Sequence, residues 1–358
     1  MLKNPQLSRE KYRTERSSEL CAAVDITPYR ISVVFYDLAL SRRYARTSLC
    51  GEHITCDNVA SQLSRLFSLS GKEYGIPASA LKKIGFAAPV HLSCFIEEKL
   101  SPVELYLRPE TELFVMPYIS AEISGRFTAS LLALPDGDCL AADFADKLYI
   151  AQVKDGVPRC AAFPLAGAFD GTALEGGMSA ERGAIDEVKR ESEGALCYGV
   201  VGDSESVGIA PSGAFSAASL MLGEGIIDSD GIMTDRDLLY IGEDFFISQS
   251  DVRAIQTDRA RCEAAFEVFC GEDSVPKYLS GDVFAANGAR ALLKLRALPE
   301  EFSKAGFAGN SVEQGIIRCL ESEDELSRAL TFAMTAEDVT EQYLQRFHEI
   351  SVEKYSFS

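Results

Sequence analysis

The apolar residues near the start of the chain fall into two short runs with a tight connection between them. The first run, residues 20–26, carries an aspartate at position 25, and the second run covers residues 31–37. Both runs are rich in Val, Ile, Phe and Tyr, which predicts strands, and the short connection predicts an antiparallel hairpin. The same pattern returns at residues 139–153, where the first run contains Asp143. We therefore expect two equivalent hairpins, each with an aspartate near the end of its first strand.

The pattern around these hairpins predicts an α/β protein made of two similar halves. The turn LPDGD at residues 134–138 predicts the boundary between them. We expect a solvated tail at residues 1–18, a first lobe at 19–135, and a second lobe with C-terminal helices at 136–358. The proline-containing segment 100–118 is expected to form a loop. Helical periodicity is clearest at residues 248–269, and further helices are expected at residues 57–69, 125–134 and 338–350.

Length, composition and charge restrict the classes of function. With 358 residues and 47% apolar content, the chain is expected to fold into two domains or subdomains. The formal net charge of −19 argues against a nucleic-acid surface, which needs clustered Lys and Arg. No apolar stretch approaches the roughly 20 residues of a membrane helix, and the charged N-terminus does not look like a secretory signal. We therefore expect a cytoplasmic protein that binds neither nucleic acid nor membrane.

The cysteines and histidines do not suggest a metal or a catalytic triad. Ten cysteines are scattered along the chain, and no C-x-x-C pair occurs. Zinc and iron–sulfur sites need closely spaced cysteines, so we expect no iron–sulfur cluster and reduced, mostly buried thiols. The three histidines lie far apart, and no Ser–His–Asp set can be assigned.

Two hairpins with an aspartate at equivalent places resemble the phosphate loops of the actin, sugar kinase and Hsp70 superfamily. One such hairpin is common and says little, whereas two in corresponding halves, each followed by strand–turn–helix units, favour the resemblance. It implies a duplicated actin-like (ASKHA, ribonuclease H-like) α/β fold with ATP and a metal ion in a central cleft. In such loops, backbone N–H groups hold phosphate oxygens, and carboxylates hold Mg²⁺, usually through water.

The second half also resembles, in order and spacing, the C-terminal region of the reductive activators of corrinoid proteins. These proteins are ATPases within the same superfamily. The resemblance is strong from residue 139 onward and weaker over residues 20–138. It rests on AGAFDGTALEGGMSAERGAID (166–186), GIAPSGAFSAASLMLGEGIIDSDG (208–231), ISQSDVRAIQTDRA (247–260), YLSGDVFAANGARAL (278–292) and GFAGNSVEQGII (306–317).

This resemblance implies a site, a cofactor and a partner. Asp25 and Asp143 would be catalytic and would organise Mg²⁺. ATP would be the cofactor, and a corrinoid protein or a corrinoid-dependent methyltransferase the partner. The resemblance also implies a homodimer. The implied cofactor-binding residues are Thr27 and Ala145 in the hairpin turns, Gly176, Gly177, Ser212 and Gly213 around the phosphates and nucleoside, and Arg259 and Gly281 on the adenine side.

The chain departs from the family pattern where the nucleotide would bind. The family's Asp-Ile-Gly-Thr loops read Asp-Ile-Thr-Pro at residues 25–28 and Asp-Phe-Ala-Asp at residues 143–146. Its Gly-Ser-Gly turn begins here with Pro211, and its double glycine reads Gly-Asp at residues 281–282. Pro28 has no N–H group, and Asp146 adds negative charge beside a triphosphate. The sequence also lacks the family's ferredoxin-type domain, so a separate protein would have to supply an electron.

Two hypotheses follow. The first is an ATP-binding protein, related to the corrinoid activators, with weak or absent hydrolysis. The second is a nucleotide-free scaffold or regulator with degenerate phosphate loops that binds a corrinoid protein or a methyltransferase. The missing loop glycines favour the second hypothesis, and the two aspartates with the glycine-rich run favour the first.

Overall fold

The computed structural model divides the chain into two compact units. It describes residues 19–50, 52–191, 194–234, 237–242, 244–271, 275–284, 288–309 and 311–357, so the predicted tail at 1–18 lies outside the described residues. The first unit comprises Met1–Gly137, Lys154–Arg159 and Asn310–Asp338, and the second comprises Asp138–Val153, Cys160–Gly309 and Val339–Ser358.

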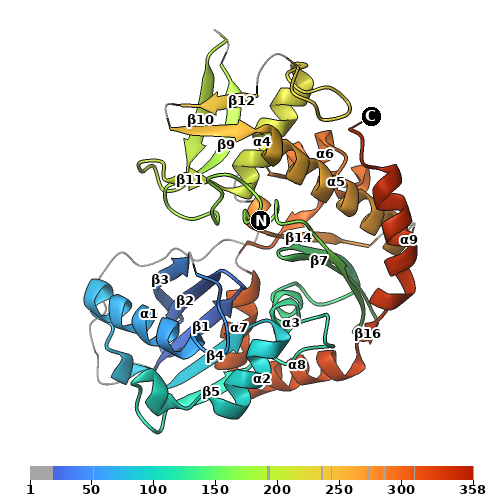
Figure 1. Ribbon diagram of the computed structural model, residues 1–358. Helices are drawn as coiled ribbons and strands as arrows, with labels where there is room; N and C mark the ends of the chain where they lie inside the picture. Colours follow the sequence, from blue (N-terminus) through green and yellow to red (C-terminus); the bar gives the residue numbers. More distant parts are fainter. Residues whose placement is uncertain are drawn as a thin grey trace. The chain divides into compact units, whose positions relative to one another are not determined.

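The first unit is built on a five-stranded sheet with the order β3-β2-β1-β4-β5 (Figure 1). Strand β2 pairs antiparallel with both β1 and β3, whereas β4 pairs parallel with β1 and β5 pairs parallel with β4. The predicted hairpin is β1 and β2. The strands are β1 (Leu20–Ile26), β2 (Arg30–Asp37), β3 (Arg42–Cys50), β4 (Lys83–Ala87) and β5 (Glu112–Val115). The helices are α1 (Val59–Tyr74), α2 (Val90–Lys99), α3 (Gly125–Leu132), α7 (Ser311–Glu321) and α8 (Glu323–Thr335).

Helix α7 joins the first unit because glycines allow very close packing. A β-carbon at Gly315 would lie 1.9 Å from the carbonyl oxygen of Ala129 on α3. On the sheet side, a β-carbon at Gly85 of β4 would lie 2.5 Å from Cγ2 of Ile316. The hydroxyl groups of Ser130 and Ser311 are 2.7 Å apart and add a hydrogen bond between the two helices. Residues 310–338 thus group with the first unit, whereas the sequence alone placed the whole of 136–358 in the second lobe.

The main sheet of the second unit repeats the topology of the first. Its order is β15-β14-β6-β7-β8-β16, so β8, β7, β6, β14 and β15 follow the same sequence of neighbours as β3, β2, β1, β4 and β5. Strand β6 is antiparallel to β7 and parallel to β14, as β1 is to β2 and β4. The strands are β6 (Cys139–Phe144), β7 (Lys147–Lys154), β8 (Val157–Pro164), β14 (Lys277–Gly281) and β15 (Gly306–Phe307). The sixth strand in the order, β16 (Glu337–Asp338), belongs to the segment 310–338 that groups with the first unit.

Helices and small sheets complete the second unit. Helix α5 begins with a capping box, in which Ser248 and Asp251 bond each other's backbone N–H groups. The helices are α4 (Pro211–Gly223), α5 (Gln249–Phe269), α6 (Gly288–Lys294) and α9 (Thr340–Glu353). The small sheets contain β9 (Ala184–Arg190), β10 (Leu196–Val200) and β11 (Gly208–Ile209), and β12 (Leu238–Ile241) with β13 (Phe245–Ser248).

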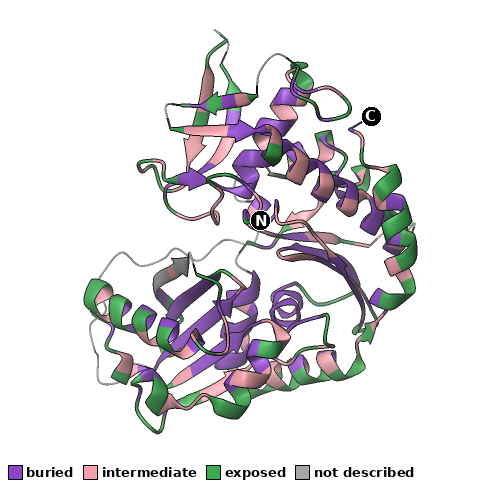
Figure 2. Ribbon diagram, viewed as in Figure 1, coloured by how far each residue is buried: buried purple, intermediate pink, exposed green. Residues whose placement is uncertain are grey.

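Each unit has its own hydrophobic core. The central strands of both main sheets are buried, while α1, α8 and α9 each expose one side to solvent (Figure 2). Within the described residues, no helix combines the length and the apolar character that crossing a membrane would require. Segment 100–118, expected to be a loop, contains the edge strand β5 and the short 3₁₀-helix η2 (Pro102–Leu105).

Candidate functional site

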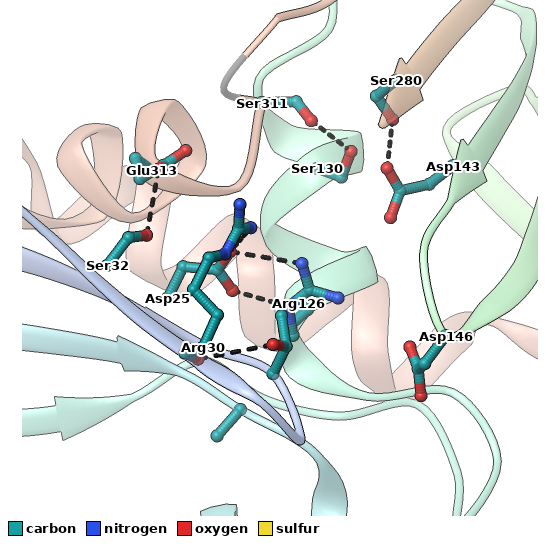
Figure 3. A network of polar contacts seen from close by, with 12 residues as sticks. Asp25, Arg30, Ser32, Arg126, Ser130, Asp143, Asp146, Ser280, Ser311 and Glu313 are labelled. Atoms are coloured by element: carbon teal, nitrogen blue, oxygen red, sulfur yellow. Dashed lines mark hydrogen bonds and ion pairs between the residues drawn. The ribbon is translucent and has the colours of Figure 1, made fainter. Parts of the chain in front are cut away.

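The carboxylate of Asp25 is bonded by two guanidinium groups in the first unit (Figure 3). Nε of Arg126 lies 2.5 Å from Oδ1, and a terminal nitrogen of the same group lies 3.2 Å from Oδ2. A terminal nitrogen of Arg30 lies 3.4 Å from Oδ2. All three side chains are buried. Arg126 and Asp25 thus form a bidentate ion pair at the place where the family resemblance implied a metal ion.

The turn after Asp25 uses its own backbone groups. The N–H of Thr27 donates to the carbonyl oxygen of Arg30 at 2.8 Å, and the Thr27 hydroxyl accepts from the N–H of Tyr29 at 3.4 Å. Pro28 has no N–H group to offer. In the predicted phosphate loop of the first unit, the N–H of Thr27 is therefore already hydrogen-bonded, and Pro28 has no N–H to donate.

In the second hairpin, the hydroxyl of Ser280 donates to Oδ1 of Asp143 at 2.5 Å (Figure 3). The two residues are register partners on the parallel strands β6 and β14, which brings their side chains together. The N–H of Ala145 donates to the carbonyl oxygen of Lys147 at 3.0 Å, so this turn also uses its first N–H internally. Asp146 is half-buried in the same turn.

Two carboxylates on α5 hold the glycine-rich segment 166–178. Asp258 accepts hydrogen bonds from the N–H groups of Ala166 and Ala168, and Asp251 accepts one from Glu175 at 2.7 Å. Burial raises the pKa of the Asp258 carboxyl from 3.8 to about 6, against the lowering effect of its two N–H partners. Burial also raises the pKa of Asp251. The acidic residues of α5 thus position the loop that the resemblance places at the ligand.

Close backbone packing explains three of the four predicted site glycines. A β-carbon at Gly177 would lie 2.1 Å from the carbonyl oxygen of Gly171, and one at Gly281 would lie 2.3 Å from that of Phe144. At Gly213, the distance to the carbonyl oxygen of Ile185 would be 2.2 Å. Gly176 has space around it but adopts φ +69°, where glycine is favoured. These positions need glycine whether or not a ligand binds.

Ser212 is different, because packing does not explain its hydroxyl. Its side chain lies in the first turn of α4, is 1% exposed, and has no hydrogen-bond partner for Oγ among the described residues. Buried polar groups are almost always hydrogen-bonded, so we expect this hydroxyl to bond a group outside the described residues. The first N–H groups of a helix also lack partners within the helix and attract anions.

Arg259 lies in a buried network of the second unit. Its Nε donates to the carbonyl oxygen of Leu295 at 2.8 Å, and a terminal nitrogen donates to that of Lys354. A second terminal nitrogen lies 3.1 Å from Glu263. With 1% exposure, the side chain joins α5 to the end of α6 and to the end of α9. These three contacts of Arg259 are therefore structural.

Sequence reasoning missed Arg126, Ser280 and Asp258. Arg126 and Asp25 are 101 positions apart, and Ser280 and Asp143 are 137 apart, so no local pattern connects them. A register prediction for β6 and β14 would have found Ser280. Among the described residues, no group of three or more His, Cys, Asp or Glu side chains is arranged to hold a metal ion.

Comparisons with known proteins agree with this architecture. Residues 153–358 match the family described as the C-terminal domain of RACo, the ASKHA domain. A protein of Eubacterium limosum named "Corrinoid activation enzyme RamQ" is 28% identical over 196 residues, which cover 44% of this chain and 31% of that protein. A solved structure titled "Reductive activator for corrinoid,iron-sulfur protein" superposes with a TM-score of 0.85 at 16% identity, covering 96% of this chain and 67% of its own.

The predicted duplicated actin-like α/β fold is confirmed by these matches. The predicted resemblance to corrinoid activators is confirmed as well. The match to the curated relative spans about a third of that relative's length, so the relative's whole activity does not transfer with the match.

Proposed function

The chain belongs to the family of the C-terminal ASKHA domain of RACo, and from this membership we propose that its second unit binds ATP and that the chain acts on a corrinoid protein. The observation that carries ATP binding is the buried hydroxyl of Ser212 in the first turn of α4, which has no hydrogen-bond partner among the residues that the structure describes. A phosphate oxygen accepts from such a hydroxyl and from helix N–H groups.

The surroundings of α4 support this assignment. Helix α4 packs against the short helix η3 (Asp282–Phe284), which directly follows Gly281 at the end of β14. Asp143 lies at the end of the neighbouring parallel strand, β6. Ligands of open α/β sheets bind outside the carboxyl ends of parallel strands. Asp143, next to the hydroxyl of Ser280, is the carboxylate that would hold Mg²⁺ with the nucleotide in this unit.

We expect hydrolysis to be weak or absent. In both hairpin turns the first N–H is hydrogen-bonded within the hairpin, at Thr27 and at Ala145. Pro28 offers no N–H, and Asp146 would repel a triphosphate. With fewer donors aimed at the phosphates, the developing charge of phosphoryl transfer is stabilised less.

A nucleotide-free role is the second candidate. It is favoured by Gly177, Gly213 and Gly281, whose presence is explained by packing alone. In this role the chain is a scaffold or regulator that binds a corrinoid protein or a corrinoid-dependent methyltransferase. The homodimer implied by the family is compatible with either role.

The corrinoid partner is proposed from the names of the relatives, one of which is a corrinoid activation enzyme and the other a reductive activator. Pull-down of purified corrinoid proteins by the chain, with and without ATP, tests the partner, and absence of any binding in both conditions would refute it.

A thermal-shift titration with ATP tests the nucleotide. Binding to the folded state raises the melting temperature by mass action. Ser212→Ala should leave the melting temperature of the free protein unchanged or raise it, because a buried unpaired hydroxyl is removed. The same change should weaken ATP binding about 10-fold or more, since a hydrogen bond to a charged group contributes about 1.5–3 kcal/mol.

Ser219→Ala is the matched control, because Ser219 lies on the same helix and is half-exposed. It should leave both quantities unchanged. No shift of the wild-type protein at millimolar ATP would refute nucleotide binding and leave the scaffold role. An ATP shift that Ser212→Ala leaves intact would place the nucleotide elsewhere.

A further inference from the structure

We propose that Asp25 binds no divalent cation, because the guanidinium group of Arg126 has taken the position of the cation. The family implies a carboxylate here that organises Mg²⁺. In this chain, Arg126 bonds both oxygens of that carboxylate, at 2.5 and 3.2 Å. Asp25 is 2% exposed and Arg126 is 6% exposed, so the pair is shielded from water.

The chain positions Arg126 for this contact by close packing at the start of α3. Arg126 is the second residue of the helix, directly after Gly125. A β-carbon at Gly125 would lie 2.2 Å from the carbonyl oxygen of Met116, so a larger residue there would push the helix start away. The position of the α3 backbone therefore places the guanidinium group of Arg126 beside Asp25, and this side chain is buried.

Two carboxylates and two guanidinium groups lie together around Asp25. Ser32 is the register partner of Asp25 on β2, and its hydroxyl donates to the carboxylate of Glu313 at 3.3 Å (Figure 3). Directly opposed residues of antiparallel strands share one face, so Glu313 belongs to the same cluster. Asp25, Glu313, Arg30 and Arg126 are all buried and carry two negative and two positive charges. A divalent cation would add two positive charges to this buried cluster, which already holds two guanidinium groups.

A cation and the guanidinium group therefore exclude one another. Mg²⁺ needs near-octahedral oxygen ligands and retains several waters. Arginine keeps its charge at every accessible pH, so it cannot vacate the site by losing a proton. Coordination of Asp25 would break its bidentate ion pair with Arg126 inside a buried cluster, which weakens cation binding about 100-fold or more relative to a carboxylate without this partner.

Mn²⁺ binding to the full chain without nucleotide tests the proposal, so its result does not depend on whether ATP binds. Asp25→Asn should leave the Mn²⁺ binding of the otherwise wild-type protein unchanged. Arg126→Met keeps a long apolar side chain and removes the charge. Arg126→Met should bind Mn²⁺ at least about 100-fold more tightly than the wild type does. The double variant with Asp25→Asn should lack this site. A wild-type site that Asp25→Asn abolishes, or a folded Arg126→Met protein without a new site, would overturn the proposal.

A second measurement needs only the wild-type protein, in case the variants do not fold. Fe²⁺ with ascorbate and peroxide cuts a protein backbone near a bound cation. No EDTA-sensitive cleavage is expected near residues 25–30 or 126. Cleavage at either place would show a cation at Asp25 and refute the replacement.

Discussion

Gly213 offers the sharpest test of why this chain keeps a family glycine. It lies in α4, where replacement of glycine by alanine ordinarily gains up to about 1 kcal/mol. Here the added β-carbon would lie 2.2 Å from the carbonyl oxygen of Ile185 and 2.9 Å from its carbonyl carbon. Relieving this clash requires a shift of roughly 1 Å between two backbones, because carbon–oxygen contacts are normally about 3.3 Å or longer. Overpacking of this kind costs about 1–3 kcal/mol.

We therefore expect Gly213→Ala to lower the free energy of unfolding by about 1–3 kcal/mol in urea titrations, through a lower midpoint at unchanged slope. The melting temperature should fall about 2–4 °C per kcal/mol for a domain of 150–250 residues. Gly223→Ala is the matched control, since it lies in the same helix with nothing within 4 Å of the added carbon. It should leave stability unchanged or raise it. If Gly213→Ala instead left stability intact and removed only ATP binding, the packing explanation would be refuted.

Three further predictions concern buried groups. Because the folded-state pKa of Asp258 is raised to about 6, the wild type should lose stability relative to Asp258→Asn as the pH rises from 4 to 6.5. A shift of two pKa units is worth about 3 kcal/mol, and a flat difference in urea titrations across this range would contradict it. Arg259→Met should lower the free energy of unfolding by about 3 kcal/mol, since it breaks bonds to the carbonyl oxygens of Leu295 and Lys354; unchanged stability with lost ATP binding would move Arg259 to the ligand. Four buried thiols, whose pKa values burial raises, should resist a thiol reagent at pH 8 until the protein unfolds, and rapid reaction of any of them would refute their burial. These thiols are Cys21, Cys139, Cys262 and Cys319.

Local patterns predicted the strands and hairpins well, because each depends on neighbouring residues. Both aspartate hairpins and helix α5 were found this way. The edge strand β5 was missed, since four residues beside prolines carry little periodic signal. The assignment of α7 to the first unit was also missed, because it depends on Gly315 meeting α3, far away in sequence.

The candidate site was harder to predict than the fold. Sequence position placed Asp25 and Asp143 at equivalent points of their hairpins, but it could not identify their hydrogen-bond partners. The partner of Asp25 comes from a helix 101 positions later, and a positively charged residue in such a helix reads equally well as a solvated side chain. Such a pairing is set by tertiary packing, which one sequence does not display.

The glycines that match the family's motifs therefore say less about function than the match suggests. A glycine required by a backbone contact stays in place whether the protein binds nucleotide or not, and Gly177, Gly213 and Gly281 are of this kind. A side chain that is buried, polar and without a packing reason behaves differently, because folding loses stability by keeping it. In the first turn of α4 that side chain is Ser212. Loss of ATP binding on Ser212→Ala, with the apoprotein undamaged, would thus report on the ligand, whereas the same loss on a glycine change would report on the fold.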